Sequence, residues 1–282
     1  MSVDTTSQQR RLFVGRLGGY GMLVLLSAVT AAPLLWMVLT SVRPPNTVFG
    51  GSLIPESFTL DAYRRAWLEL DFGSHFWTSM WLTTGTCLLV VALATLGGYA
   101  FAKLRFPGRQ IIYVTLLSTL MLPATAIIIP LFLELKAFNL LDTRQGLLLV
   151  YVGISLPFSM FLMRAFFETL PDELVDAARV DGAGEFTIFW RVMLPLAAPG
   201  VATVVIFQFM QTWNEFLFAQ TFLQTPAYLP LQPVLYSLIG QYATDWTMLT
   251  ASLTMSVLPV IVVYVRLQRR FIAGLTAGAL KD

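Results

Sequence analysis

Long apolar runs alternate with short polar segments along the whole chain. The apolar runs cover residues 17–42, 77–101, 110–133, 145–167, 199–223 and 246–265. A helix needs about 20 predominantly apolar residues to cross a bilayer, and each run is close to or above that length. We therefore predict an all-α integral membrane protein with six transmembrane helices. Pro123 and Pro130 should kink the third helix, because proline cannot donate the helical hydrogen bond.

This pattern divides the chain into four segments. They are an N-terminal tail at 1–16, a first transmembrane helix with an outer loop at 17–76, a transmembrane core at 77–265 and a C-terminal tail at 266–282. A cleaved signal peptide is the alternative for the N-terminus, but the run at 17–42 is too long for the apolar region of a signal peptide.

The outer loop contains an amphipathic pattern. One helical face carries Tyr63, Ala66, Trp67 and Leu70, and the opposite face carries Arg64, Arg65 and Glu69. This spacing predicts a short helix on the outer surface of the membrane.

The polar segment 171–199 lies between two apolar runs and carries several charged residues. Gly182 and Gly184 should divide it into two short helices. The first helix places on one face Leu174, Ala177, Ala178 and Asp181, where the alanines allow another backbone to approach closely. The second places on one stripe Phe186, Phe189, Trp190 and Met193, and such a helix should lie in the plane of the membrane interface.

The positive charges indicate the orientation. Most of the 18 Lys and Arg residues fall on the side of the membrane that holds the N-terminus, if six helices are crossed in turn. Because positive residues accumulate on the cytoplasmic side, both termini and the loop 171–199 are predicted to be cytoplasmic.

Composition excludes several classes of function. Only 12% of residues are charged and the net charge is +2, which does not indicate a nucleic-acid partner. One histidine, His75, and one cysteine, Cys87, cannot form a metal cluster, so we expect no metal site. A membrane-embedded enzyme would need convergent catalytic side chains that this composition hardly supplies. No lysine follows a G-x-x-x-x-G pattern, so any ATP should be hydrolysed by another subunit and this chain should bind no cofactor.

The loop 171–199 also carries a family motif. Asp176-Ala177-Ala178, Gly182 and the stretch 192–195 resemble, in order and spacing, the EAA loop of ABC importer permeases, with Asp176 in place of Glu and Val192 in place of Ile. In that family the loop is a cytoplasmic coupling helix that docks into a groove of a separate ATPase. The resemblance implies coupling residues at Asp176, Ala177, Ala178, Asp181, Gly182 and Pro195. The alternative is an ordinary interfacial loop.

Further stretches extend the resemblance. Residues 140–143, 156–158, 213–216 and 274–279 are similar to the maltose-type branch of sugar importer permeases. This implies a type I ABC importer transmembrane domain in the bacterial plasma (inner) membrane. It also implies a sugar substrate, a second homologous permease chain, two ATPase subunits or domains that use ATP and Mg, and an extracytoplasmic binding protein. Import of another solute, such as an amino acid or a peptide, is the alternative.

Two polar features are candidates for further roles. The fifth apolar run places on one face Gln208, Gln211, Thr212 and Glu215, at offsets of three, four and seven. These residues could line the sugar pathway, form hydrogen bonds between helices, or pair with the second permease. The glycines and alanines of 274–279 predict a flexible strand that contacts the ATPase pair, or a disordered anchor.

Overall fold

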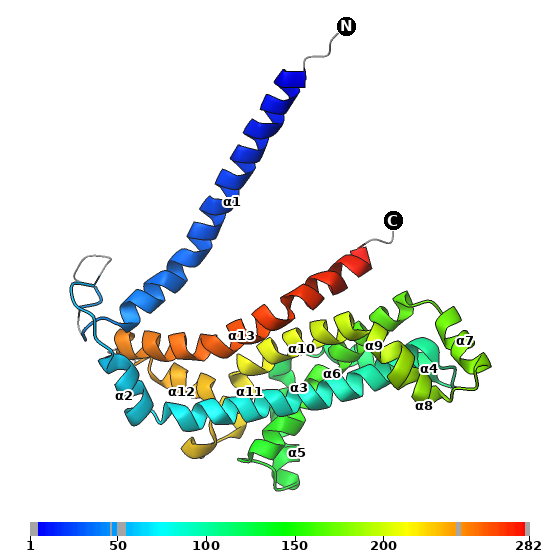
Figure 1. Ribbon diagram of the computed structural model, residues 1–282. Coiled ribbons are helices and arrows are strands. Elements are labelled where there is room, and N and C mark those ends of the chain that lie inside the picture. Colours follow the sequence, from blue (N-terminus) through cyan, green and yellow to red (C-terminus); the bar gives the residue numbers. More distant parts are fainter. Residues whose placement is uncertain (1–4, 46, 50–54, 241–243, 280–282) are drawn as a thin grey trace. The chain divides into compact units, whose positions relative to one another are not determined.

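The computed structural model describes residues 5–45, 47–49, 55–240 and 244–279, and these residues form helices and loops without a strand (Figure 1). The longer helices are α1 (Thr5–Ser41), α2 (Asp61–Glu69), α3 (Phe72–Lys103), α4 (Arg109–Ser118), α5 (Ala124–Ala137), α6 (Arg144–Thr169), α7 (Glu173–Val180), α10 (Ala198–Trp213) and α13 (Trp246–Ala279). The shorter ones are η1 (Thr119–Met121), α8 (Glu185–Ile188), η2 (Phe189–Met193), α9 (Leu194–Leu196), α11 (Leu217–Phe222), η3 (Pro226–Tyr228) and α12 (Leu231–Ser237). This confirms the all-α prediction.

Four helical stretches are long and apolar enough to cross a membrane: Gly19–Ser41, Phe72–Lys103, Arg144–Thr169 and Trp246–Arg269. Two bent helix pairs raise the number to as many as six if each pair is one span. The predicted count of six is therefore compatible with the described residues, provided that two of the spans are broken.

The first broken pair corresponds to the predicted third span. Arg109–Met121 and Ala124–Ala137 meet at 106°. Leu122 and Pro123 are extended, as expected where a proline restricts the residue before it. The predicted kink at Pro123 is confirmed but is a complete break, whereas Pro130 lies inside α5.

The predicted fifth span, 199–223, is wrong as one continuous helix. Helix α10 ends at Trp213, and α11 begins only at Leu217. The side chain of Glu215 accepts hydrogen bonds from the backbone N–H groups of Phe218 and Ala219, so it starts a new helix instead of continuing the old one.

The tails are also more helical than predicted. Helix α1 begins at Thr5, inside the predicted tail 1–16, and α13 continues through Ala279. The strand expected at 274–279 is therefore wrong. Residues 1–4 and 280–282 of the two tails lie outside the described residues.

The chain forms two compact units. The first contains residues 1–70 and 238–255, and the second contains residues 71–237 and 256–282. In the first unit the predicted amphipathic helix is present as α2, but the face that it buries is formed by Ala62 and Ala66. Trp67, predicted on the apolar face of this helix, is 56% exposed.

Helices α3 and α6 form the centre of the second unit and pack very closely. A Cβ atom on Gly98 would lie 2.6 Å from Cβ of Met163 and 2.8 Å from the backbone nitrogen of Arg164. Small residues permit such contacts between helices in lipid. The core around these helices continues to Val175, Ile188 and Met193, and so supports the loop that contains the candidate coupling residues.

Candidate functional site

The candidate coupling loop starts where α3 ends. Lys103, the last residue of α3, donates hydrogen bonds to the backbone oxygen of Leu170, at 2.7 Å, and to the carboxylate of Asp172. The hydrogen bond from Lys103 and its positive charge hold the pKa of Asp172 below its usual value. The lysine therefore fixes the start of α7 to the end of a transmembrane helix.

The turn after α7 is a helix cap that requires glycine. Ala183 N–H donates to Ala178 O and Gly182 N–H donates to Arg179 O, both at 3.0 Å, which is the Schellman pattern. Gly182 has φ +81°, in the left-handed region that glycine adopts without strain. The predicted helix break at Gly182 is confirmed.

Arg179 joins the two halves of the loop across this turn. Its guanidinium contacts Asp176 at 3.2 Å and Glu185 at 2.8 Å. The other oxygen of Glu185 accepts a hydrogen bond of 3.1 Å from the hydroxyl of Tyr99 in α3. The hydrogen bond to Glu185, reinforced by the charges of Glu185 and Asp176, raises the pKa of Arg179 above its usual value, although desolvation opposes this.

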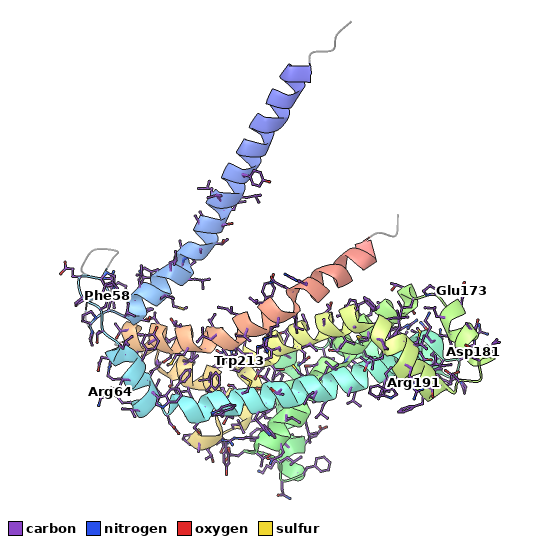
Figure 2. The ribbon with its side chains drawn as sticks, in the orientation of Figure 1. Phe58, Arg64, Glu173, Asp181, Arg191 and Trp213 are labelled. Carbon is purple, nitrogen blue, oxygen red and sulfur yellow. The ribbon has the colours of Figure 1, made fainter. Side chains whose placement is uncertain are left out.

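The loop has a buried underside and an exposed outer face. Val175, Ile188, Phe189 and Met193 are buried. The exposed or half-exposed residues include all six predicted coupling positions: Asp176, Ala177, Ala178, Asp181, Gly182 and Pro195. The loop is seen in Figure 2 around the labelled residues Glu173, Asp181 and Arg191. The structure thus leaves the small face of α7 accessible to a partner.

In the predicted apolar stripe of the second helix, the ring centroids of Phe186 and Trp190 are 6.0 Å apart and those of Phe189 and Trp190 are 5.4 Å apart, but the stripe is only partly buried. Phe189 and Met193 are buried, but Phe186 and Trp190 are 72% and 50% exposed. A π-helical turn covers Phe189–Met193, in which Leu194 N–H donates to Phe189 O. Its wider turn shifts the positions that follow away from the 3.6-residue repeat.

A polar cleft of ≈ 810 Å³ lies beside the coupling loop. One wall is the turn after α3, with Lys103, Arg105 and Arg109, and the other is α7, with Asp172 and Asp176. Sequence reasoning did not identify Lys103 or Arg179 as residues that hold the loop. The available signal was the set of opposite charges at the end of one apolar run and at both ends of the polar segment.

A second cavity, of ≈ 360 Å³, lies within the second unit and contains three of the four predicted pathway residues. Gln211, Thr212 and Glu215 line it together with an aromatic pair, Phe158 and Phe207, whose ring centroids are 4.6 Å apart. This combination of polar groups and aromatic faces suits a ligand that carries both hydroxyl groups and apolar C–H surface.

The fourth predicted residue, Gln208, lies next to this cavity but is buried. Its Nε2 donates to the hydroxyl of Ser155 at 3.0 Å and to that of Thr212 at 2.8 Å. It therefore joins α6 to α10, as the hydrogen-bonding alternative expected.

Glu215 is likewise held by the protein. Its carboxylate accepts from the Tyr151 hydroxyl at 2.5 Å, from Phe218 N–H at 2.7 Å and from Ala219 N–H at 3.1 Å. Three donors surround this carboxylate, whereas Gln211 is exposed on the wall of the same cavity. Within the part of the chain that the structure describes, no three His, Cys, Asp or Glu residues gather as a metal site would require.

Comparison with known proteins identifies the family. A profile described as "Binding-protein-dependent transport system inner membrane component" matches residues 94–276. The diacetylchitobiose uptake system permease protein of Streptomyces coelicolor is 35% identical over 93% of this chain and 88% of its own length. The trehalose transport system permease protein of Mycobacterium tuberculosis is also 35% identical, over 88% of this chain and 92% of its own length.

Solved structures agree with these relatives. A chain of a bacterial ABC transporter that imports the acidic polysaccharide alginate superposes with a TM-score of 0.80 at 26% identity, over 93% of this chain and 98% of that one. A chain of a methionine ABC transporter superposes with a TM-score of 0.54 at 17% identity, over 70% of this chain and 93% of that one, which supports the fold alone. The chain therefore belongs to the binding-protein-dependent transport system inner membrane components, the permease subunits of ABC transporters.

Proposed function

We propose that this chain is the permease subunit of an ATP-driven importer for a sugar or a sugar-like solute. The observation that carries the substrate class is the similarity to permeases whose named cargoes are diacetylchitobiose and trehalose, both carbohydrates. The alginate importer adds a further carbohydrate at 26% identity. Import of amino acids or peptides has no comparable support, because the methionine transporter is similar only in fold.

The chain would form half of the transmembrane pathway. The other half would come from a second homologous permease, and two ATPase subunits or domains would bind ATP and Mg at the cytoplasmic side. An extracytoplasmic binding protein, as the family description implies, would deliver the solute. Membrane lipid would surround the assembly, and no nucleic-acid partner is proposed.

The loop 171–199 would transmit force between the ATPase and the membrane helices. The outer face of α7 and its C-terminal cap, with Asp176, Ala177, Ala178, Asp181 and Gly182, is exposed or half-exposed and would enter a groove of the ATPase. Lys103 holds the start of α7 to α3, and Arg179 joins α7 to the second half of the loop. A displacement of α7 would therefore be transmitted through the loop to the transmembrane helices.

Disulfide capture tests this role. In a Cys87→Ser background, Ala177→Cys should cross-link to a cysteine placed in the ATPase groove. The matched control is Gln220→Cys, an exposed position on α11. A cross-link from Gln220→Cys but not from Ala177→Cys would exclude the proposed docking.

The proposed orientation places both termini and this loop in the cytoplasm, as the distribution of Lys and Arg favours. A membrane-impermeant thiol reagent should label Ala177→Cys in inverted vesicles and leave it unlabelled in intact cells. Labelling in intact cells would reverse the orientation and would remove the coupling role with it.

The cavity lined by Gln211 would be part of the sugar pathway. Amide groups pair with sugar hydroxyls, and the faces of Phe158 and Phe207 could contact the apolar side of a sugar ring. The C-terminal end of α13 would contact the ATPase pair, since the family resemblance covers residues 274–279.

A further inference from the structure

Helix α2 has an exposed apolar face that the proposed function does not use. Ala62 and Ala66 are buried on one side of the helix. At helical spacing, the opposite side carries Leu60, Arg64, Trp67 and Leu68. Leu60 is 70% exposed, Trp67 56% and Leu68 66%. Large apolar side chains that are exposed together on one side of a short helix indicate a surface that covers them.

Two contacts place α2 beside the end of α1. The hydroxyl groups of Ser41 and Tyr63 are 2.7 Å apart, and Thr59 N–H donates to Val42 O at 2.8 Å. Ser41 is the last residue of α1. Because α1 contains a stretch apolar enough to cross the membrane, its end marks a membrane surface.

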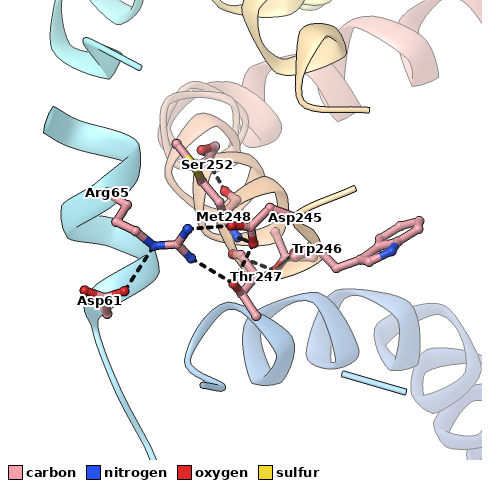
Figure 3. A network of polar contacts seen from close by, with 8 residues as sticks. Asp61, Arg65, Asp245, Trp246, Thr247, Met248 and Ser252 are labelled. Atoms are coloured by element: carbon pink, nitrogen blue, oxygen red, sulfur yellow. Dashed lines mark hydrogen bonds and ion pairs between the residues drawn. The ribbon is translucent and has the colours of Figure 1, made fainter. Parts of the chain in front are cut away.

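A polar network fixes α2 to the start of α13 as well, as Figure 3 shows. Arg65 contacts the carboxylate of Asp61 at 3.0 Å and that of Asp245 at 2.5 Å, and it donates to the Thr247 hydroxyl at 3.3 Å. Asp245 in turn accepts from Met248 N–H at 3.0 Å, in the first turn of α13. A helix tied to the ends of two membrane-spanning helices must lie at the membrane surface.

The network remains charged at neutral pH. Burial raises the pKa of Asp245, but hydrogen bonds from Arg65, Met248 N–H and Thr247 outweigh it and keep this pKa below its usual value. The hydrogen bond to Asp245 raises the pKa of Arg65. The attachment of α2 is thus present under ordinary conditions.

Aromatic residues in the same unit indicate what covers the exposed face. Trp246, the first residue of α13, is 39% exposed and contacts Phe49 edge-on, with ring centroids 5.6 Å apart. Tryptophan concentrates at the boundary between membrane and water. Arg64, labelled in Figure 2, is exposed, and helical spacing puts it between Leu60 and Leu68. A long arginine side chain can cover apolar surface while its guanidinium reaches toward a headgroup phosphate.

We infer that α2 is an interfacial anchor whose face of Leu60, Arg64, Trp67 and Leu68 is immersed in the lipid headgroup region where α1 ends. Interfacial helices of this kind bury their apolar face by about 5–10 Å. The partner is the bilayer surface, with Arg64 at the headgroup phosphates. The Arg65 network keeps α2 flat on this surface and couples its position to the first turn of α13.

Nitroxide labels on α2 in lipid nanodiscs test this inference. In the full-length chain with its co-purifying subunits and Cys87→Ser, one label is placed at Leu68→Cys and a control label at Glu69→Cys. Glu69 is exposed but points toward the opposite side of the helix. The Leu68 label should collide several-fold more with oxygen than with a water-soluble nickel complex, and the Glu69 label should show the reverse. Leu60→Cys repeats the measurement if Leu68→Cys does not accumulate.

Three results would overturn the inference. Equal access of the nickel complex to both labels would place α2 in water. A Leu68 label that is immobile and closed to both reagents would mean that a protein subunit covers the face. A change in the Leu68 label only after a solute-binding protein is added would assign the face to that partner. A further expected result is that Arg65→Ala lowers the oxygen preference of the Leu68 label, because the helix is then released from α13.

Discussion

At the scale of single residues, Glu215 and Gln211 on the cavity of ≈ 360 Å³ have different environments. Glu215 accepts three hydrogen bonds from the protein, whereas Gln211 is exposed on the cavity wall. A carboxylate that already has three donors contributes to the break between α10 and α11 more than to the binding of a solute. The exposed amide is the better candidate for solute contact.

Replacing Glu215 by Gln should therefore affect stability more than solute affinity. A carboxamide has one acceptor oxygen where the carboxylate has two, so at least one donor loses its partner. Hydrogen bonds to charged groups contribute about 1.5–3 kcal/mol, and we expect a loss of that order in the free energy of unfolding. Thermal unfolding in detergent and the apparent KM for transport separate the two effects.

The matched variant is Gln211→Ala, which should raise the KM and change stability by less than about 0.5 kcal/mol, as is usual for exposed positions. An unchanged KM for Gln211→Ala together with a raised KM for Glu215→Gln would reverse these assignments.

The two glycines of the coupling loop allow an equally direct comparison. A Cβ atom at Gly182 or at Gly184 would meet nothing within 4 Å, so only the backbone distinguishes them. Gly182 has φ +81° and Gly184 has φ −74°. Gly182→Ala should destabilise the loop by about 1–2 kcal/mol, the cost of a left-handed conformation for an L-residue. Hydrogen exchange of the α7 amides measures this cost, and Gly184→Ala, the control, should leave the exchange rates unchanged or lower them.

At the scale of the elements, local signals in the sequence were sufficient for α7 and its cap. Gly182 specifies where the helix stops, and this prediction is confirmed, while the acidic residues Asp172 and Glu173 lie at its observed start. The spacing predicted the apolar stripe of the following helix, but neither the π-helical turn at Phe189–Met193 nor which of the side chains are buried. The break after Trp213 was also missed, because the helical spacing of Gln208, Gln211, Thr212 and Glu215 does not show that the Glu215 side chain accepts hydrogen bonds from the backbone N–H groups of Phe218 and Ala219.

The pair formed by Lys103 and Asp172 gives a prediction for the attachment of α7 to α3. The pKa of Asp172 is lowered in the folded protein from an ordinary value of 3.8, mainly by the hydrogen bond from Lys103. A lowered carboxylate pKa stabilises the folded state above the unfolded pKa, and this contribution is lost as the pH falls through the folded pKa. The attachment should therefore be constant at neutral pH and should weaken only below pH 3.8.

Hydrogen exchange at neutral pH tests this attachment. Lys103→Met should accelerate exchange of the amides at the start of α7, because the lysine also holds the backbone oxygen of Leu170. Arg105→Met, a change of charge in the same turn, is the control and should have little effect. Equal acceleration by both variants would show that general charge in this cleft, and not the Lys103 contacts, holds the helix.

At the scale of the whole molecule, α13 joins two segments that we predicted as separate elements, the last transmembrane helix and the C-terminal tail. It begins at Trp246, next to the Arg65 network, and remains helical through Ala279. The sequence predicted a span that ends near residue 265 and a strand-like tail, because glycine and small residues at 274–279 have weak helix signals. A continuous helix transmits displacement along its axis better than a strand does. If the last turns of α13 contact the ATPase pair, their displacement would therefore be transmitted to the membrane helices.

Removal of residues 274–282 should uncouple ATP hydrolysis from solute import. The deletion shortens α13 at the end that we propose to contact the ATPase pair, while the four candidate spans, which end by Arg269, remain complete. In proteoliposomes, the number of ATP molecules hydrolysed per solute imported should rise. A deletion of residues 280–282 is the matched control, because it leaves the described part of α13 intact, and its ratio should equal that of the full chain. If the longer deletion also retains the full-chain ratio, α13 has no part in coupling, and the loop 171–199 must transmit the whole of the ATPase movement.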